Sequence, residues 1–272
     1  MAKKSFVDWL YTTAPGRMTL KVLLYTGALK LGEMVARSQL SKPFISRYIK
    51  NNNIDMSDFK GQKYNSFQDF FSRKRDDIEV DRQAEHLISP CDGYLSAYRI
   101  KSNNSFHIKG SWYKVTDLVT NKKIAKEFVG GDCVILRLCA NDYHYCYIDD
   151  GFQGRNHFVK GLLHSVQPIA LENVPVYRQN RRMWTILDTV NFGKVAQIEI
   201  GALLVGGIVN DHENVMMRKG AEMGHFELIG STIVLLFKKG HIDLLPEIKE
   251  CIKGDKEVRV IQGQHIANRT VF

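Results

Sequence analysis

Residues 226–237 read FELIGSTIVLLF, so that Gly230-Ser231-Thr232 separates two apolar segments. The second segment, Ile233–Phe237, is uninterrupted and apolar, which predicts a buried strand. A hydroxyl directly after a glycine could attack its own backbone there, because glycine leaves the attacked carbonyl accessible and tolerates unusual conformations. Taken alone, the three small residues are more typical of a plain loop or bulge.

Two other segments supply groups that a hydroxyl nucleophile needs. Residues 88–93 (ISPCDG) contain Asp92, and residues 141–147 (NDYHYCY) contain His144. An acid, an imidazole and a hydroxyl that meet in space can act as a nucleophilic set. Read separately, Asp92 is typical of an Asp-Gly turn, and a lone histidine beside aromatic residues is usually structural.

Length and composition bound the fold and the compartment. With 272 residues and 44% hydrophobic content, the chain can bury a sizeable core. Its five cysteines are irregularly spaced without a CxxC pair, which argues against a disulfide framework and against a metal site of the zinc type. We therefore expect a reducing compartment. Met1-Ala2-Lys3-Lys4 is not followed by a secretory signal pattern, which predicts cytoplasmic synthesis.

The positive charge is concentrated in the N-terminal part. The chain carries a formal net charge of +9. Residues 1–75 contain 14 Lys and Arg against 5 Asp and Glu, whereas residues 76–272 contain 24 of each. We interpret residues 1–86 as a basic, helical, membrane-associating arm with a polar linker.

A helical stretch in this arm is the candidate membrane contact. Residues 18–31 (MTLKVLLYTGALKL) are apolar over much of a helical circumference, with Lys21 and Lys30 interrupting. The stretch is shorter than the ~20 apolar residues of a spanning helix. A helix of this kind could lie in the interface of an anionic membrane, or pack on the protein's own core. Nucleic acid is disfavoured as a partner, because the aromatic residues of the arm accompany aliphatic ones and form no known binding module.

From about Leu87 onward the pattern changes to strands. Short runs rich in Val, Ile, Leu and aromatic residues are bounded by Gly, Asp or Asn, which is typical of a β-rich core. These runs are residues 134–138, 143–148, 185–187, 195–200, 203–209 and 233–237. The sequence therefore predicts an α+β protein, with the helical arm at 1–86 and a β-rich catalytic core at 87–272.

Short motifs in a fixed order are spread over nearly all of the chain. They are FQDFFSR (67–73), PCDG (90–93), IKG (108–110), DYH (142–144), VAQIEIGA (195–202), KGAEMG (219–224) and GST (230–232). Together they resemble the motifs of the phosphatidylserine decarboxylase proenzymes, a family of pyruvoyl-dependent decarboxylases.

The resemblance implies a chemistry for these motifs. The Ser231 hydroxyl would attack the Gly230 carbonyl and divide the chain into a β-chain (1–230) and an α-chain (231–272). Ser231 would become a covalent pyruvoyl group, which forms a Schiff base with the substrate amine and accepts the electron pair left by carbon dioxide. His144 would be the base for self-cleavage, and Asp92 would orient its imidazole. Thr232 would donate a hydrogen bond near the cleaved carbonyl.

One position departs from the family pattern. Many members carry a second histidine three residues after the first, so that one serves self-cleavage and the other decarboxylation, but this chain has Tyr147 there. Either His144 serves both steps or another histidine helps. His164 and His225 are the candidates, although each is more typical of a structural residue.

The resemblance implies a phosphatidylserine decarboxylase that forms phosphatidylethanolamine and carbon dioxide. It also implies phosphatidylserine and an anionic membrane surface as partners, and a peripheral location on the cytoplasmic side of the cell membrane. A homodimer stays open as a further partner arrangement. Two alternatives stay open. One is a pyruvoyl-dependent decarboxylase of a soluble amino acid, for which the basic arm would have no obvious use. The other is an inactive homologue that only binds membranes. The presence together of Asp92, His144, Gly230, Ser231 and Thr232 argues against it.

Overall fold

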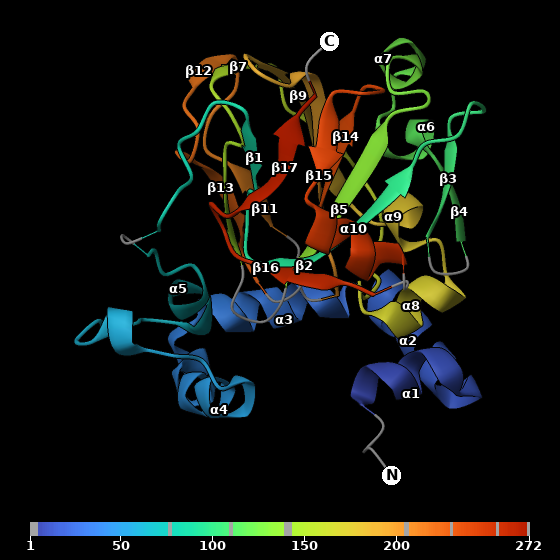
Figure 1. Ribbon diagram of the computed structural model, residues 1–272. Coiled ribbons are helices and arrows are strands. Elements are labelled where there is room, and N and C mark those ends of the chain that lie inside the picture. The colour runs from blue at the N-terminus through green and yellow to red at the C-terminus, as the bar shows by residue number, and fades with distance from the viewer. Residues whose placement is uncertain are drawn as a thin grey trace.

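A computed structural model describes residues 5–75, 78–108, 111–138, 143–203, 207–228, 231–253 and 256–270 of the chain (Figure 1). Helices dominate the N-terminal part, and strands dominate from His86 onward, which confirms the predicted α+β class. In Figure 1 the first helices lie side by side along one side of the sheets. Gly230 and Asp142, both named above, fall outside the described residues.

The N-terminal helices are short and interrupted. They are α1 (Phe6–Thr12), α2 (Ala14–Tyr25), α3 (Ala28–Arg37), η1 (Gln39–Ser41), α4 (Lys42–Asn52), η2 (Ser57–Phe59) and α5 (Phe67–Phe71). The single helical stretch expected over residues 18–31 is wrong, because α2 ends at Tyr25 and α3 begins at Ala28. Gly27 lies between them with φ 77°, a left-handed conformation that breaks a helix and that glycine adopts without strain.

A nine-stranded antiparallel sheet forms the centre of the molecule. Its strands follow the order β12-β7-β9-β10-β14-β5-β2-β16, and β8 pairs with β9 beside this path. Their bounds are β2 (Gly93–Arg99), β5 (Asp132–Leu138), β7 (Gly151–Gln153), β8 (His157–Val159), β9 (Arg182–Thr189), β10 (Gly193–Ile200), β12 (Val215–Met217), β14 (Ser231–Phe237) and β16 (Val258–Val260).

Three smaller sheets and five short helices complete the described part of the core. The small sheets have the orders β11-β13-β6, β1-β17-β15 and β3-β4. Their strands are β1 (His86–Ile88), β3 (Ser105–Ile108), β4 (Ser111–Lys114), β6 (His144–Cys146), β11 (Ile208–Asn210), β13 (Glu222–Phe226), β15 (Ile242–Leu244) and β17 (His265–Arg269). The helices are α6 (Val115–Leu118), α7 (Lys122–Lys126), α8 (Pro168–Asn173), α9 (Val176–Gln179) and α10 (Pro246–Lys253).

The predicted strand at 233–237 is confirmed, and it begins two residues earlier than expected. β14 runs between β10 and β5 with every side chain from Ser231 to Phe237 buried. Ser231 pairs with Leu138, and Thr232 pairs with both Arg137 and Ile200. Ser231 and Thr232 are therefore the first residues of a central strand rather than part of a loop.

The helical arm and the sheets share one hydrophobic core. Buried side chains of the arm join the same cluster as the strands, among them Leu10, Leu20, Phe67, Phe70 and Phe71. Tyr11 of α1 lies 3.1 Å (Oη to Nδ1) from His164 and also accepts the Ser165 N–H. The arm therefore packs on the protein's own core along one side, as one of the two sequence interpretations expects, and it leaves its other side exposed.

Candidate active site

Ser231 is buried at the start of β14. Its residue is 1% exposed, and its hydroxyl makes no hydrogen bond of good geometry with any residue that the structure describes. An unpaired buried hydroxyl costs free energy, so such groups in proteins usually have a functional reason. The Thr232 hydroxyl is likewise buried without a well-formed hydrogen bond, although Tyr177 of α9 lies close to it.

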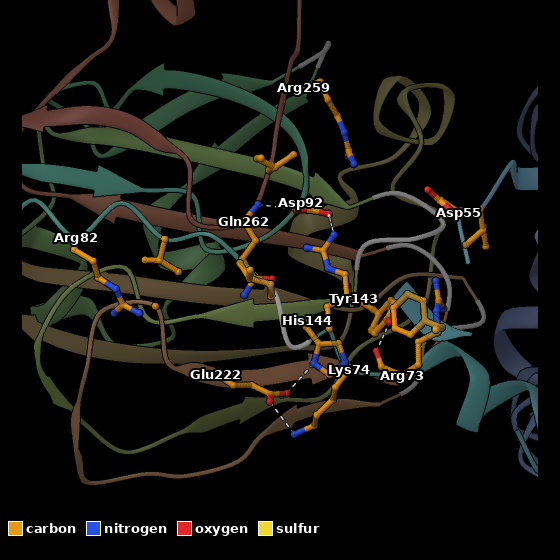
Figure 2. A pocket seen from close by; sticks show the side chains of 17 residues that line it. Asp55, Arg73, Lys74, Arg82, Asp92, Tyr143, His144, Glu222, Arg259 and Gln262 are labelled. Atoms are coloured by element: carbon orange, nitrogen blue, oxygen red, sulfur yellow. Dashed lines mark hydrogen bonds and ion pairs between the residues drawn. The ribbon is translucent and has the colours of Figure 1, made fainter. Parts of the chain in front are cut away.

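A pocket of about 520 Å³ brings Asp92 and His144 together (Figure 2). Asp92 comes from the turn before β2, and His144 begins β6. The segment between α4 and α5 contributes Ile54, Asp55 and Phe59, so the pocket lies where the helical arm meets the core. Ser231 is not among its lining residues.

Asp92 and Ser231 nevertheless lie at the same end of the large sheet. β5 runs between β2 and β14, and Leu138 at the end of β5 pairs with Ser231. On the other side of β5, Gly93 directly follows Asp92 and packs closely on the backbone of Arg137 and Leu138. Adjacent strands are about 4.8 Å apart, so Gly93 and Ser231 lie roughly 10 Å apart.

Glu222, rather than Asp92, is hydrogen-bonded to the His144 imidazole. Oε1 of Glu222 lies 2.7 Å from Nδ1 of His144, and Oε2 lies 2.7 Å from Nζ of Lys74. Figure 2 shows the three side chains converging from β13, β6 and the segment after α5. Because an ionised carboxylate accepts from Nδ1–H, this contact leaves Nε2 as the basic nitrogen.

The electrostatic setting keeps His144 neutral. Burial lowers the pKa of His144, and this effect outweighs the nearby Glu222 carboxylate, which raises it. Burial raises the pKa of Glu222, but its hydrogen bonds to Lys74 and His144 outweigh burial and leave that pKa lowered. Nε2 of His144 makes no well-formed hydrogen bond among the described residues, although the Ser72 backbone is near. A neutral imidazole with a bare Nε2 can accept a proton.

Asp92 has other partners than the expected one. Its Oδ1 accepts the Gln262 N–H at 2.6 Å, and its Oδ2 lies 3.3 Å from Nη1 of Arg75. The expected contact of Asp92 with the imidazole is therefore replaced by the Glu222 contact. Asp92 instead ties the turn before β2 to the segment after β16, and it places the Arg75 charge in the pocket.

Of the two other histidines considered, only His225 is near His144. His225 pairs with His144 across β13 and β6, and the ring centroids are 5.3 Å apart. Its Nδ1 is buried without a well-formed hydrogen bond among the described residues. His164 lies against Tyr11, in keeping with a structural role. Tyr147, at the position of the missing second histidine, donates its hydroxyl hydrogen to Gln153 Oε1 at 2.5 Å.

The pocket carries more basic than acidic side chains. Its lining includes Arg73, Lys74, Arg75, Arg82 and Arg259 against Asp55, Asp92 and Glu222. Arg73 is buried and stacks on the ring of Phe70, with 4.4 Å from the guanidinium carbon to the ring centroid. A site with clustered guanidinium groups suits a ligand that carries phosphate or carboxylate groups.

In the part of the chain that the structure describes, two clusters have the residue types that bind metals. In each, the ligand atoms lie within 4.8 Å of one another; they are Asp81, His86 and His265, and His144, Glu222 and His225. The second cluster is the acid–base group of the pocket, and the first joins β1 to β17. Contacts within the protein explain the polar groups of the first cluster, because Asp81 bonds to His86 and Asn268 bonds to His265.

The outer side of the helical arm exposes many large apolar side chains. We call α1 to α4 the helical layer, and its exposed apolar residues are Phe6, Met18, Val22, Tyr25, Leu31, Met34, Val35, Leu40 and Phe44. An apolar surface of this extent on a monomer usually marks a contact with a membrane or another molecule. Among the helices that the structure describes, none is long and apolar enough to cross a membrane.

Sequence reasoning did not identify Glu222 or Arg75 as functional. Glu222 belongs to the motif KGAEMG, so it was visible as part of a pattern, but nothing in the pattern pairs it with residue 144. The pairing arises because β13 and β6 are neighbours and because a bulge between Glu222 and Gly224 changes the register there. Arg75 lies outside every motif considered.

Comparisons with known proteins identify relatives of the whole chain. Residues 67–268 match the family model described as phosphatidylserine decarboxylase. The chain is 40% identical to phosphatidylserine decarboxylase proenzyme 2 of Clostridium acetobutylicum, over 97% of this chain and 92% of that protein. It is 37% identical to the phosphatidylserine decarboxylase proenzyme of Clostridium beijerinckii, over 100% of this chain and 95% of that protein. The proenzyme of Clostridium kluyveri is also 37% identical, over 98% and 93% respectively.

Proposed function

Because the chain belongs to the phosphatidylserine decarboxylase family, we propose that it is a self-processing enzyme that converts phosphatidylserine to phosphatidylethanolamine and carbon dioxide. The observation that carries this proposal is the buried Ser231 hydroxyl, which has no hydrogen-bond partner among the described residues and stands at the first residue of β14, at the same sheet end as the pocket of Asp92 and His144. A hydroxyl in that position fits the precursor of a pyruvoyl group.

Self-cleavage would proceed at the bond between Gly230 and Ser231. Oγ of Ser231 attacks the Gly230 carbonyl carbon, the C–N bond breaks, and the nitrogen of residue 231 takes up a proton, which converts the amide into an ester. Removal of the Cα proton of residue 231 then expels the Gly230 carboxylate. The remaining dehydroalanine shifts to its imine, which water hydrolyses to a carbonyl group with release of ammonia. The products are a β-chain (1–230) and an α-chain (231–272) that begins with a pyruvoyl group.

His144 is the proposed base of this site. Its Nε2 makes no well-formed hydrogen bond among the described residues and would accept a proton, and Glu222, which accepts from Nδ1–H, would stabilise the imidazolium that forms. Asp92 remains in the proposed catalytic set. It would act by its ion pair with Arg75 and its hydrogen bond from the Gln262 N–H, because Glu222 rather than Asp92 contacts the imidazole. With Tyr147 bonded to Gln153, it is His225 that supplies the second imidazole beside His144.

The pocket is proposed to hold the lipid head group. A pyruvoyl group at position 231 supplies a carbonyl that condenses with the substrate amine and accepts the electrons left by carbon dioxide. The basic residues of the pocket would bind the phosphate and orient the serine carboxylate, and burial around His144 would exclude water. The neutral imidazole would exchange protons with the reacting amino acid.

The helical layer is proposed to seat the enzyme peripherally on the cytoplasmic side of an anionic membrane. Its exposed apolar side chains would enter the interface, and the excess of basic residues in 1–75 would be attracted by anionic head groups. The segment that directly follows this layer, between α4 and α5, lines the pocket with Ile54, Asp55 and Phe59, so a head group could enter the pocket while the acyl chains stay in the bilayer.

The test is intact-mass analysis of the purified protein together with an assay of carbon dioxide release. We expect two chains, with an α-chain of residues 231–272 that lacks a free amino terminus, and activity on phosphatidylserine vesicles. A single uncleaved chain in an active preparation would refute the proposal. Activity on free amino acids without activity on vesicles would favour a decarboxylase of soluble substrates.

A further inference from the structure

A layer of buried polar side chains lies between the large sheet and the small sheet β11-β13-β6. We call it the inter-sheet layer; it comprises the buried Gln197 and Glu199 of β10 and Tyr145 of β6, together with the half-buried Asn210 of β11. The Gln197 amide donates to Oε1 of Glu199 at 2.8 Å and contacts Sδ of Met223 in β13 at 3.1 Å. The Tyr145 hydroxyl donates to Asn210 Oδ1 at 2.7 Å. β10, which carries Gln197 and Glu199, pairs with β14, the strand that begins with Ser231.

Strand register places Glu199 and Ser231 on the same face of the large sheet. Glu199 pairs directly with Ile233 across β10 and β14, so their side chains share a face. Ser231 precedes Ile233 by two residues and therefore points to that face as well. Glu199 and Ser231 are thus diagonal neighbours on adjacent strands, with Cβ atoms roughly 7 Å apart, a separation that a long side chain can bridge.

Each of the two groups carries an unused oxygen. Glu199 is 0% exposed, and its Oε2 makes no well-formed hydrogen bond with the described residues, although the Asn210 amide is near. The Ser231 hydroxyl is also buried and makes no well-formed hydrogen bond with the described residues. A buried carboxyl and a buried hydroxyl on one sheet face are costly to leave unpaired, and each can satisfy the other.

His144 faces the other side of the small sheet. Successive side chains of a strand point to opposite faces. Tyr145 points into the inter-sheet layer, where burial and then the charge of Glu199 raise its pKa. His144, one residue earlier, lines the pocket instead. The described residues therefore present two separate acid–base groups to the reaction, one in the pocket and one on the face that carries the Ser231 side chain.

We propose that Glu199 takes the proton of the Ser231 hydroxyl in the first step of self-cleavage, an inference that rests on the proposed processing at Ser231. The proton moves from Oγ to the Glu199 carboxylate as the bond from Oγ to the Gly230 carbonyl carbon forms. Glu199 returns the proton to the nitrogen of residue 231 as the C–N bond breaks, so no other reactant is required. His144 then serves the later removal of the Cα proton.

The acidity of Glu199 suits this task. Burial raises the pKa of Glu199 to about 7, and the Gln197 hydrogen bond opposes the rise. A carboxyl with a pKa near the working pH is both ionised often enough and basic enough to accept a proton. The other ionisable groups that the structure describes around Tyr145 and Glu199 are Glu222 from β13, Asp211 directly after β11 and Cys91 before β2. Contacts of this kind often tighten only during the reaction, which accounts for the missing hydrogen bond.

The test separates ester formation from chain cleavage. Freshly synthesised chains are followed by mass spectrometry with and without neutral hydroxylamine, which cleaves an ester at residue 231 but leaves an amide intact. We expect wild type to mature. Without hydroxylamine the His144→Ala chain should stay uncleaved. With hydroxylamine it should be cut at residue 231, because it has formed the ester. Glu199→Gln should resist both, with ester formation at least ~100-fold slower, which is the contribution of a positioned general base.

The pH dependence and the controls exclude a merely structural role. In wild type the rate of ester formation should rise with pH through an inflection near 7 as Glu199 ionises, and Glu199→Gln should lack that inflection. Met183→Leu, which changes the neighbour of Glu199 on β9, should behave as wild type. Wild-type ester formation in folded Glu199→Gln would overturn the inference. If Glu199→Gln fails to fold, Glu199→Asp is measured instead. Its ester formation should be slower than in wild type but keep a pH inflection. A wild-type rate of ester formation in Glu199→Asp would refute the inference. A wild-type chain that never forms ester or cleaves would instead remove the proposed function.

Discussion

In the sheet core, β14 buries every side chain from Ser231 to Phe237, whereas α2 and α3 of the helical layer hold Met18, Tyr25 and Leu31 out to solvent. The charges differ as well: residues 1–75 carry the whole net positive charge, and residues 76–272 carry equal numbers of basic and acidic residues. Under the proposed function, the core would use its apolar residues to hold the reacting groups, and the layer would use its exposed ones to contact a membrane. Changes in one region should leave the other's task intact.

The largest effect should come from Ser231→Ala. Without the hydroxyl, neither ester nor pyruvoyl group can form, so the chain should stay whole and decarboxylation should fall below detection. Binding to anionic vesicles should be unchanged, because the helical layer is untouched. Intact mass, carbon dioxide release and vesicle co-sedimentation are measured on the same preparation. Loss of vesicle binding would show that the two regions are coupled.

His144→Ala should also prevent maturation, since the pocket then lacks its proposed base. Uncleaved chain should accumulate over hours after synthesis, as seen by gel and mass analysis. His164→Ala, which removes an imidazole outside the pocket, is the matched control and should mature. If His144→Ala cleaves normally but does not decarboxylate, His144 belongs to the substrate step alone.

Glu222→Gln should slow maturation by about ten- to hundredfold, because the imidazole loses the carboxylate that orients and stabilises it. Glu222 raises the pKa of His144 against the larger effect of burial, so its removal should lower that pKa further. The inflection of the His144-dependent step should therefore move to lower pH. Glu127→Gln removes a carboxylate bound by Lys194 and Lys238 outside the pocket, and it should change neither rate nor inflection.

Much of this comparison was predictable from sequence, and the limits have physical causes. The buried strand at 233–237 followed from an apolar run, and the basic arm followed from charge counts. Period and composition cannot report which strands become neighbours, so the Glu222 contact and the inter-sheet position of Glu199 were out of reach. The helical break at Gly27 was missed because an apolar pattern can continue across a residue that leaves the helical conformation.

The helical layer is tested with Leu31→Ser combined with Leu40→Ser, in a Ser231→Ala background that cannot consume the lipid. Both leucines are exposed, so the folded state should tolerate the change. Each leucine that enters a membrane contributes on the order of 1–2 kcal/mol, and binding to phosphatidylserine vesicles should weaken at least ~tenfold. Val190→Ser, an exposed apolar residue of the core, is the control. Equal binding of all variants, or no binding by any of them at low salt, would refute the membrane role.

The smallest effect should come from His164→Ala, which probes the boundary between the two regions. The Tyr11 hydroxyl contacts the His164 ring and accepts the Ser165 N–H, so this contact fastens α1 to the core. Its loss should cost about 1 kcal/mol of unfolding free energy, measured by urea denaturation of the uncleaved Ser231→Ala chain. Burial lowers the pKa of His164, so the folded state keeps this ring neutral while the unfolded chain protonates it below pH ~6.5. Wild type therefore loses this contribution as the pH falls below that value, and the gap between wild type and His164→Ala should shrink toward pH 5. If the difference in unfolding free energy between wild type and His164→Ala instead grew as the pH falls, the folded protein would favour a charged His164. That result would contradict a contact between Tyr11 and a neutral imidazole.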